Sequence, residues 1–289
     1  MNTETHYYIN QVATITGLSK QVIRKWEDRY NVVSPTRLDN GYRVYRQADI
    51  NCLLHVKELK AEGLTTGKAI NEVKKIYKAN KNSEVDYNNY TIQLLEHGKY
   101  YKEVQMSQVL KQAYYFYGLE LMIEEVIRPF LKEIGNRWEN GEWSESQETV
   151  SSMVIRDFLI QVRRNLPTLE NAPLVIGACL PEERHELPLH INLLPLTLKG
   201  CRTLLLGPSP APGTIERLTE SLQPKTVLLS ATTDIPFKTE PGLLKHWDEF
   251  AKTHPQTNFY LGGKGALEYT DQHPPSFIKA TNDLKDIKV

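Results

Sequence analysis

The feature that most restricts the fold of this chain is a glycine turn between two short helical patterns near its N-terminus. Apolar residues recur at close to helical spacing over Ile9–Thr16, and Gly17 ends that helix because glycine readily adopts a positive φ. Ser19 is a natural N-cap for a second helix over Lys20–Tyr30. An Asn-Gly pair between two short extended runs then predicts a hairpin within Ser34–Tyr45. This order is typical of a winged helix-turn-helix; a plain surface helix pair with a loop would not explain the basic hairpin.

The second helix and the hairpin carry side chains that suit DNA. Ile23 and Trp26 can face inward, which leaves polar residues on the outer face of the helix. Because a recognition helix places its N-terminal residues against base edges, Gln21 and Arg24 are the best base readers, while Lys25 suits phosphate. The predicted DNA-contacting residues are Ser19, Gln21, Arg24, Lys25, Arg29, Arg37, Asn40, Tyr42, Arg43 and Tyr45.

The charge distribution points the same way. The chain has 35 Lys and Arg against 35 Asp and Glu, but residues 1–80 hold 13 basic and 8 acidic side chains, and the remainder holds 22 and 27. A basic N-terminal part on an otherwise acidic chain is an electrostatic indication of a nucleic-acid partner.

Two more helical patterns, Asp49–Glu62 and the one that begins at Leu64, follow the hairpin. The whole order, with "SPTR" and "NGYRVY" in the hairpin and "GLTTGKAINEV" in the last helix, resembles the DNA-binding domain of the MerR family of transcription regulators over residues 7–77. The resemblance implies binding of double-stranded DNA at a palindromic promoter site by a homodimer, or by a tetramer.

The second half of the chain predicts two further domains. Thr91–Leu166 reads as helices that could build a four-helix bundle, and from Pro173 short buried strands alternate with helices, which favours a parallel, doubly wound, flavodoxin-like sheet. Asp271–Val289 is polar and predicts a short closing helix or a tail. The predicted chain is multi-domain: a winged helix-turn-helix domain over 1–77, a linker over 78–90, a bundle over 91–168 and an α/β domain over 169–289.

Three loops at predicted strand ends carry the candidate ligand-binding residues. In the first loop, Glu183 could accept from one ring nitrogen of His185 and leave the other to bind a metal. Ser230 ends the third strand, and Gly262 and Gly263 end the fourth, where they would let a ligand approach the backbone. Since ligands of such sheets bind at the carboxyl ends of the strands, these residues are expected to meet.

The same residues resemble a cobalamin-binding flavodoxin-like domain, which uses an acid-x-His loop, a Ser loop and a Gly-Gly turn. The bundle adds Trp138, nine residues and Glu148, the spacing of light-sensing MerR relatives that cap cobalamin. The resemblance, to light- and cobalamin-responsive repressors of carotenoid synthesis over about residues 7–270, implies cobalamin as cofactor and His185 as its cobalt ligand. The implied cofactor-binding residues are Trp138, Glu148, Glu183, His185, Ser230, Gly262 and Gly263.

Three positions depart from that family pattern. Pro188 stands where the family loop has glycine, Thr149 where the capping histidine would follow Glu148, and Glu139 where light sensors hold a second histidine. Light-driven bis-histidine chemistry is therefore not expected. Two readings stay open: a sheet that binds cobalamin, and a ligand-free fold that serves dimerisation or contact with a regulatory protein.

The sequence therefore predicts a DNA-binding transcription regulator, a repressor rather than an enzyme. A corrinoid-dependent methyl-transfer protein is the remaining alternative, but the chain leaves no room for a substrate domain. No apolar run approaches the roughly 20 residues of a membrane span, and the N-terminus lacks a signal peptide, so the expected location is cytoplasmic. The three cysteines, Cys52, Cys179 and Cys201, are expected to be reduced core thiols.

Overall fold

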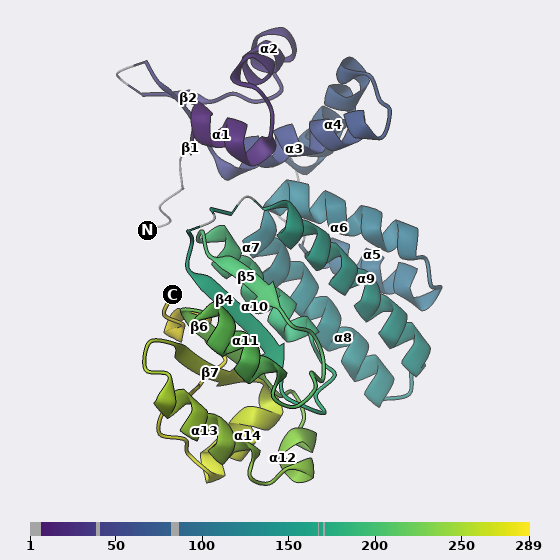
Figure 1. The fold of residues 1–289 in the computed structure, drawn as a ribbon. Coiled ribbons are helices and arrows are strands. Elements are labelled where there is room, and N and C mark those ends of the chain that lie inside the picture. Colours follow the sequence, from purple (N-terminus) through teal and green to yellow (C-terminus); the bar gives the residue numbers. More distant parts are fainter. Residues whose placement is uncertain (1–6, 39–40, 82–86, 167, 170) are drawn as a thin grey trace. The chain divides into compact units, whose positions relative to one another are not determined.

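The computed structural model describes residues 7–289 except 39–40, 82–86, 167 and 170. The chain divides into two compact units, Met1–Phe158 and Leu159–Val289. Figure 1 shows the first unit as helices with a small sheet and the second as a sheet covered by helices. The predicted fold class is confirmed in each unit.

The first unit begins with the predicted helix-turn-helix, formed by α1 (Ile9–Thr16) and α2 (Lys20–Tyr30). Gly17 ends α1 with a φ of 64°, a conformation that glycine adopts without steric cost. The Ser19 hydroxyl accepts a hydrogen bond of 3.2 Å from the backbone N–H of Val22 and so caps α2. Local chemistry thus sets the turn between the two helices.

A short antiparallel sheet and two more helices complete the winged-helix domain. Its strands lie in the order β1-β3-β2, and β3 pairs with both neighbours. The buried core under α2 includes Ile23, Trp26, Leu53 and Val73. The elements are β1 (Tyr7–Tyr8), β2 (Thr36–Arg37), β3 (Arg43–Tyr45), α3 (Gln47–Ala61) and α4 (Thr66–Lys81).

The helical bundle follows, and its helical winding changes just before Pro129. Pro129 has no N–H to donate to the carbonyl of Glu125, and the preceding turn is wound as a π-helix. The predicted linker over 78–90 is shorter than expected, because α4 continues to Lys81 and α5 begins at Tyr87. The bundle elements are α5 (Tyr87–Lys99), α6 (Glu103–Tyr117), α7 (Leu119–Met122), η1 (Ile123–Ile127), α8 (Arg128–Glu139) and α9 (Glu145–Asn165), the last of which continues into the second unit.

The second unit is a parallel sheet in the order β5-β4-β6-β7-β8. This is the flavodoxin-like order, in which the chain direction across the sheet reverses between the first and third strands, here β4 and β6. Loops at the carboxyl ends of those two strands therefore frame the expected ligand site. The elements are β4 (Leu174–Cys179), α10 (Leu187–Leu198), β5 (Arg202–Leu205), α11 (Thr214–Leu222), β6 (Thr226–Ser230), α12 (Ile235–Thr239), α13 (Leu243–Thr253), β7 (Asn258–Gly262), α14 (Lys264–Gln272), β8 (Lys279–Ala280) and η2 (Leu284–Asp286).

Alternation along β4 gives the sheet two apolar faces. Ile176 and Ala178 lie in one buried cluster with residues of α11 and α13, whereas Val175 and Cys179 lie in another with residues of α10. A strand buried on both faces reads as a continuous apolar run, which is how β4 reads in the sequence. The sheet thus has a covered face on each side and presents its loops at the strand ends.

One expectation for the second unit is corrected. The C-terminal stretch contributes a fifth strand, β8, before the short helix η2, whereas the sequence predicts only a helix or a tail. The three cysteines are buried and unbridged, as expected. Within the described residues, no helix combines the length and the apolarity that crossing a membrane requires.

Candidate functional site

The exposed face of α2 carries the predicted base-reading residues. Gln21, Arg24 and Lys25 are exposed, while Ile23 is fully buried and Trp26 is 4% exposed. The burial of these two apolar residues fixes the rotation of α2 and turns the polar residues to solvent. Arg29 is also exposed near the end of the helix, and exposed Ser19 caps its start.

Tyr45 is a correction to the predicted DNA-contacting set. Its side chain is fully buried and donates a hydrogen bond to a carboxylate oxygen of Glu27 on α2. Burial, together with that hydrogen bond, raises the pKa of Tyr45. The tyrosine therefore cannot contact DNA from this position, and it anchors the hairpin to α2 instead.

Arg43 shares this anchor. Its Nε lies 3.1 Å from the other oxygen of Glu27, a side chain that is itself only 6% exposed. Two wing residues predicted to contact DNA thus bind one buried carboxylate of α2: Tyr45 by a hydrogen bond and Arg43 by an ion pair. The consequence is a fixed geometry between the helix and the wing.

The outer part of the wing keeps predicted contact residues at the surface. Arg37 is exposed, and Tyr42 is 63% exposed with its ring edge-on to Tyr8 at a centroid distance of 6.4 Å. Asn40 lies outside the described residues. An exposed arginine and an aromatic hydroxyl are donors that suit a phosphate backbone.

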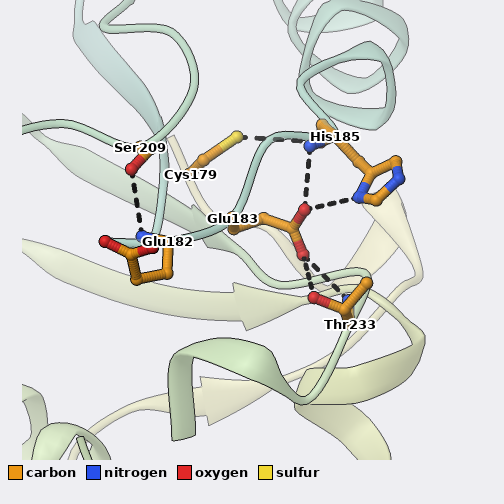
Figure 2. A network of polar contacts seen from close by, with 6 residues as sticks. All are labelled: Cys179, Glu182, Glu183, His185, Ser209 and Thr233. Carbon is orange, nitrogen blue, oxygen red and sulfur yellow. Dashed lines mark hydrogen bonds and ion pairs between the residues drawn. The ribbon is translucent and has the colours of Figure 1, made fainter. Parts of the chain in front are cut away.

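In the second unit, the loop after β4 places His185 against a buried carboxylate (Figure 2). His185 Nδ1 lies 2.6 Å from Glu183 Oε1, and the backbone N–H of His185 donates to the same oxygen at 2.8 Å. The imidazole side chain is 60% exposed, whereas that of Glu183 is 1% exposed. A carboxylate behind Nδ1 fixes the ring, so that a metal ligand from this histidine would use Nε2.

Thr233 completes this arrangement and was not singled out by the sequence. Its backbone N–H and its hydroxyl both donate to Glu183 Oε2, at 2.8 and 3.2 Å. Burial alone would raise the pKa of Glu183, but the hydrogen bonds from His185 and Thr233 outweigh it and lower the pKa to about 2. Glu183 therefore stays ionised and joins the loops after β4 and β6.

The loop after β5 supports the backbone of Glu182 and Glu183. Ser209 donates its backbone N–H to the Glu183 carbonyl at 2.8 Å, and its hydroxyl accepts from the N–H of Glu182 at 3.1 Å. Glu182 and Ser209 both have positive φ, at 68° and 41°, which is strained backbone for residues other than glycine. Three loops thus converge on Glu183 and hold His185 in place, as Figure 2 shows.

The double glycine lies in this loop cluster, but it packs against the chain itself. A Cβ at Gly263 would lie 2.3 Å from the carbonyl oxygen of Ala231, and one at Gly262 would lie 2.9 Å from that of Thr281. The Gly263 N–H donates to the Asn282 side chain at 2.7 Å. Internal packing therefore accounts for both glycines, and the approach of a ligand is not needed to explain them.

The other predicted positions have ordinary local environments. Ser230 is buried at 4% exposure at the end of β6, and Pro188 stands in the first turn of α10, where proline is tolerated. In the first unit, Trp138 is 49% exposed near the end of α8, and Glu148 accepts from the Ser152 hydroxyl at 2.7 Å. Their predicted roles toward a cofactor remain predictions.

The donor set at His185 favours one kind of metal partner. Within the described part of the chain, no group of three or more His, Cys, Asp or Glu is placed to hold a metal ion. A single oriented imidazole suits a metal that brings its remaining ligands with it, as an ion inside a macrocycle does. This chemistry matches the resemblance to cobalamin-binding domains.

Two regions of the chain match models of known protein families. Residues 7–76 match the model of MerR HTH family regulatory proteins, and residues 93–162 match the model of a B12 binding domain. The chain is 29% identical over 237 residues to the HTH-type transcriptional repressor CarH of Myxococcus xanthus, covering 78% of this chain and 79% of CarH. It is 32% identical over 82 residues to the HTH-type transcriptional regulator TnrA of Bacillus subtilis, covering 26% of this chain and 74% of TnrA.

Among solved structures, the chain is similar to the monomethylamine corrinoid protein of Methanosarcina barkeri. The TM-score is 0.51 at 15% identity, covering 65% of this chain and 91% of the corrinoid protein. At this identity the similarity shows the fold, which agrees with the strand order found in the second unit.

Proposed function

This chain belongs to the MerR HTH family of regulatory proteins, and from that membership we propose how its parts control transcription. The helix α2 and the wing bind double-stranded promoter DNA, and the sheet unit binds cobalamin through His185. The chain acts as a repressor, in keeping with the relative that matches 78% of it. The observation that carries the DNA-binding role is the exposed Gln21, Arg24 and Lys25 face over a buried Ile23 and Trp26.

The DNA target is a palindromic site read by a homodimer. A single α2 offers few base-reading side chains, and a two-fold protein doubles them on a two-fold site. The Glu27 anchor keeps the wing at a fixed position relative to α2, so base and phosphate contacts are made together. This fixed geometry supports recognition of one defined half-site.

The DNA-binding proposal is tested with Arg24→Ala in the full chain. We expect affinity for the promoter site to fall about tenfold or more and discrimination between related sequences to weaken, because one base or phosphate contact is lost. Arg128→Ala, which removes an exposed arginine of the bundle, is the matched control and leaves binding unchanged. Equal affinities for the Arg24 and Arg128 variants, measured at one salt concentration, would contradict the proposal.

Cobalamin binding is supported by the environment of His185. When bound, cobalamin would supply a cobalt ion, and His185 would be the residue that ligates it. The chain's own contribution is orientation: Glu183 holds Nδ1, and Thr233 holds Glu183. Buried partners of this kind fix a ligand ring and raise its basicity.

A ligand-free regulator is the second candidate, and the double glycine favours it. Because Gly262 and Gly263 are explained by contacts with Thr281 and Ala231, this chain would keep them without a ligand. In that case the sheet unit would serve assembly or contact with a regulatory protein.

One experiment separates the two candidates. The full chain is incubated with cobalamin, desalted, and examined by its visible spectrum. We expect colour to remain with the unaltered chain and to be lost in His185→Ala. His246→Ala is the matched control, since His246 is also an exposed histidine bonded to a carboxylate, 2.9 Å from Glu216. An unaltered chain that emerges colourless would favour the ligand-free candidate.

A further inference from the structure

Helix α3 is packed on two sides within the first unit. Leu53 and Val56 are fully buried in the core of the winged-helix domain. His55 and Glu58 of the same helix, and Glu62 just after its end, contact residues of α6 in the bundle. One helix of the DNA-binding domain is therefore also a neighbour of the bundle.

Two contacts join these helices. The rings of His55 and Tyr115 are stacked, with centroids 4.3 Å apart and planes 5° from parallel. Lys111 Nζ lies 2.8 Å from Glu58 Oε1 and 3.5 Å from a carboxylate oxygen of Glu62. The α3–α6 contact is thus a ring stack beside a basic side chain held by two acids.

Polar groups in this contact are incompletely satisfied. His55 Nδ1 and Glu58 Oε2 are buried, and neither has a hydrogen-bond partner among the described residues. Burial, and to a lesser degree the charge of Lys111, lowers the pKa of His55 to about 4, so the ring is neutral at neutral pH. A buried group without a partner is costly, and opening the contact would return both groups to water. The closed contact is therefore opposed by a desolvation cost that a purely apolar interface would not carry.

We infer that the α3–α6 contact is a reversible coupling that sets the orientation of the DNA-binding helices relative to the bundle. In the closed form the reading face of α2 remains exposed, so the contact does not block DNA. Instead it holds each winged-helix domain in one orientation, which a dimer needs to reach both halves of a two-fold site. Opening the contact keeps each domain folded but releases that orientation. The inference rests on the proposed DNA-binding function.

The test uses charge reversal in the full chain. Lys111→Glu places three acids together and opens the contact, and the double variant Glu58→Lys with Lys111→Glu restores an opposite-charge pair. Lys132→Glu, which makes the same change at an exposed position of α8, is the matched control. Hydrogen exchange of α3 and α6 reports whether the contact is closed, and DNA affinity is measured on a complete two-fold site and on a single half-site.

We expect Lys111→Glu to speed exchange in both helices and to weaken binding to the complete site by about tenfold, with half-site binding unchanged, because fixed orientation acts as an effective concentration. The double variant should recover most of both effects. Faster exchange with unchanged affinity for the complete site would overturn the inference, as would unchanged exchange or an equal loss on the half-site. Failure of the unaltered chain to bind any promoter site would instead refute the proposed function itself.

Discussion

Replacing Glu183 with glutamine tests whether this carboxylate stabilises the sheet unit through its charge. Glu183 is almost fully buried, and it accepts hydrogen bonds from His185 and from Thr233. Glutamine has nearly the same shape but carries no charge, and its amide nitrogen replaces one acceptor. The variant should therefore lose the charge-assisted part of these contacts while keeping the packing.

The size and pH range of the effect follow from the lowered pKa of Glu183. A fall from the ordinary value of 4.5 to about 2 corresponds to about 3 kcal/mol in the free energy of unfolding, at about 1.4 kcal/mol per pKa unit. Because the folded-state pKa is lowered, this stabilisation is complete above the unfolded value and is lost as pH falls toward the folded value. The difference between the two proteins should thus be about 3 kcal/mol at pH 7 and about half of that or less by pH 3.

Urea unfolding of the full chain, followed by pulsed hydrogen exchange in β4, measures this difference in the sheet unit itself. Glu182→Gln is the matched control, because Glu182 is the exposed neighbour and its substitution should change stability by less than about 0.5 kcal/mol. Equal stability of Glu183→Gln and the unaltered chain at pH 7 would refute the argument. A difference that stays constant from pH 7 to pH 3 would refute the assignment to charge.

Two further substitutions test the hydrogen bond between Tyr45 and Glu27 and the close packing at Gly263. Tyr45→Phe removes a donor from buried Glu27 and should destabilise the winged-helix domain by about 1–3 kcal/mol, measured by thermal unfolding; an unchanged midpoint would mean that the hydrogen bond is not needed. Gly263→Ala drives a Cβ to 2.3 Å from the Ala231 carbonyl at a φ of 102° and should cost more than about 3 kcal/mol, whereas Gly242→Ala, where a Cβ meets nothing within 4 Å, should be nearly neutral. Similar stability of these two alanine variants would show that the close approach at Gly263 is relieved at little cost.

Regular patterns made much of the fold predictable. The predicted bounds of α1 and α2 agree with Ile9–Thr16 and Lys20–Tyr30, because each has an apolar period and a turn or capping signal at its ends. Strand β8 escaped prediction, since Lys279–Ala280 is too short to show any period. Helix α14 escaped it as well, because its first turn lies in the glycine-rich stretch that begins at Gly262 and reads as a loop.

The sequence could not show which residues of the predicted DNA-contacting set pair with side chains far away in the chain. Tyr45 and Arg43 have donors that suit phosphate, and nothing local distinguishes them from Arg37, which is exposed. Their assignment depends on Glu27, which lies 18 residues before Tyr45 and is buried between them. Chemistry at the level of single residues predicted all three as DNA contacts, but only the fold shows that Tyr45 and Arg43 contact Glu27 while Arg37 is exposed.

In the loops of the sheet unit, a sequence motif alone does not show whether its residues bind a ligand or pack against the chain itself. The His-loop signal correctly placed Glu183 beside His185, because a short loop leaves the two side chains within reach. The glycine signal was ambiguous, since a close approach of the chain's own Ala231 demands glycine as strictly as a ligand would. Thr233 could have been noticed as one of several hydroxyl residues after β6, but its role depends on which loop it faces. Cobalamin binding must therefore be judged at His185 itself, because losing a cobalt ligand and losing loop packing would give different outcomes on substitution.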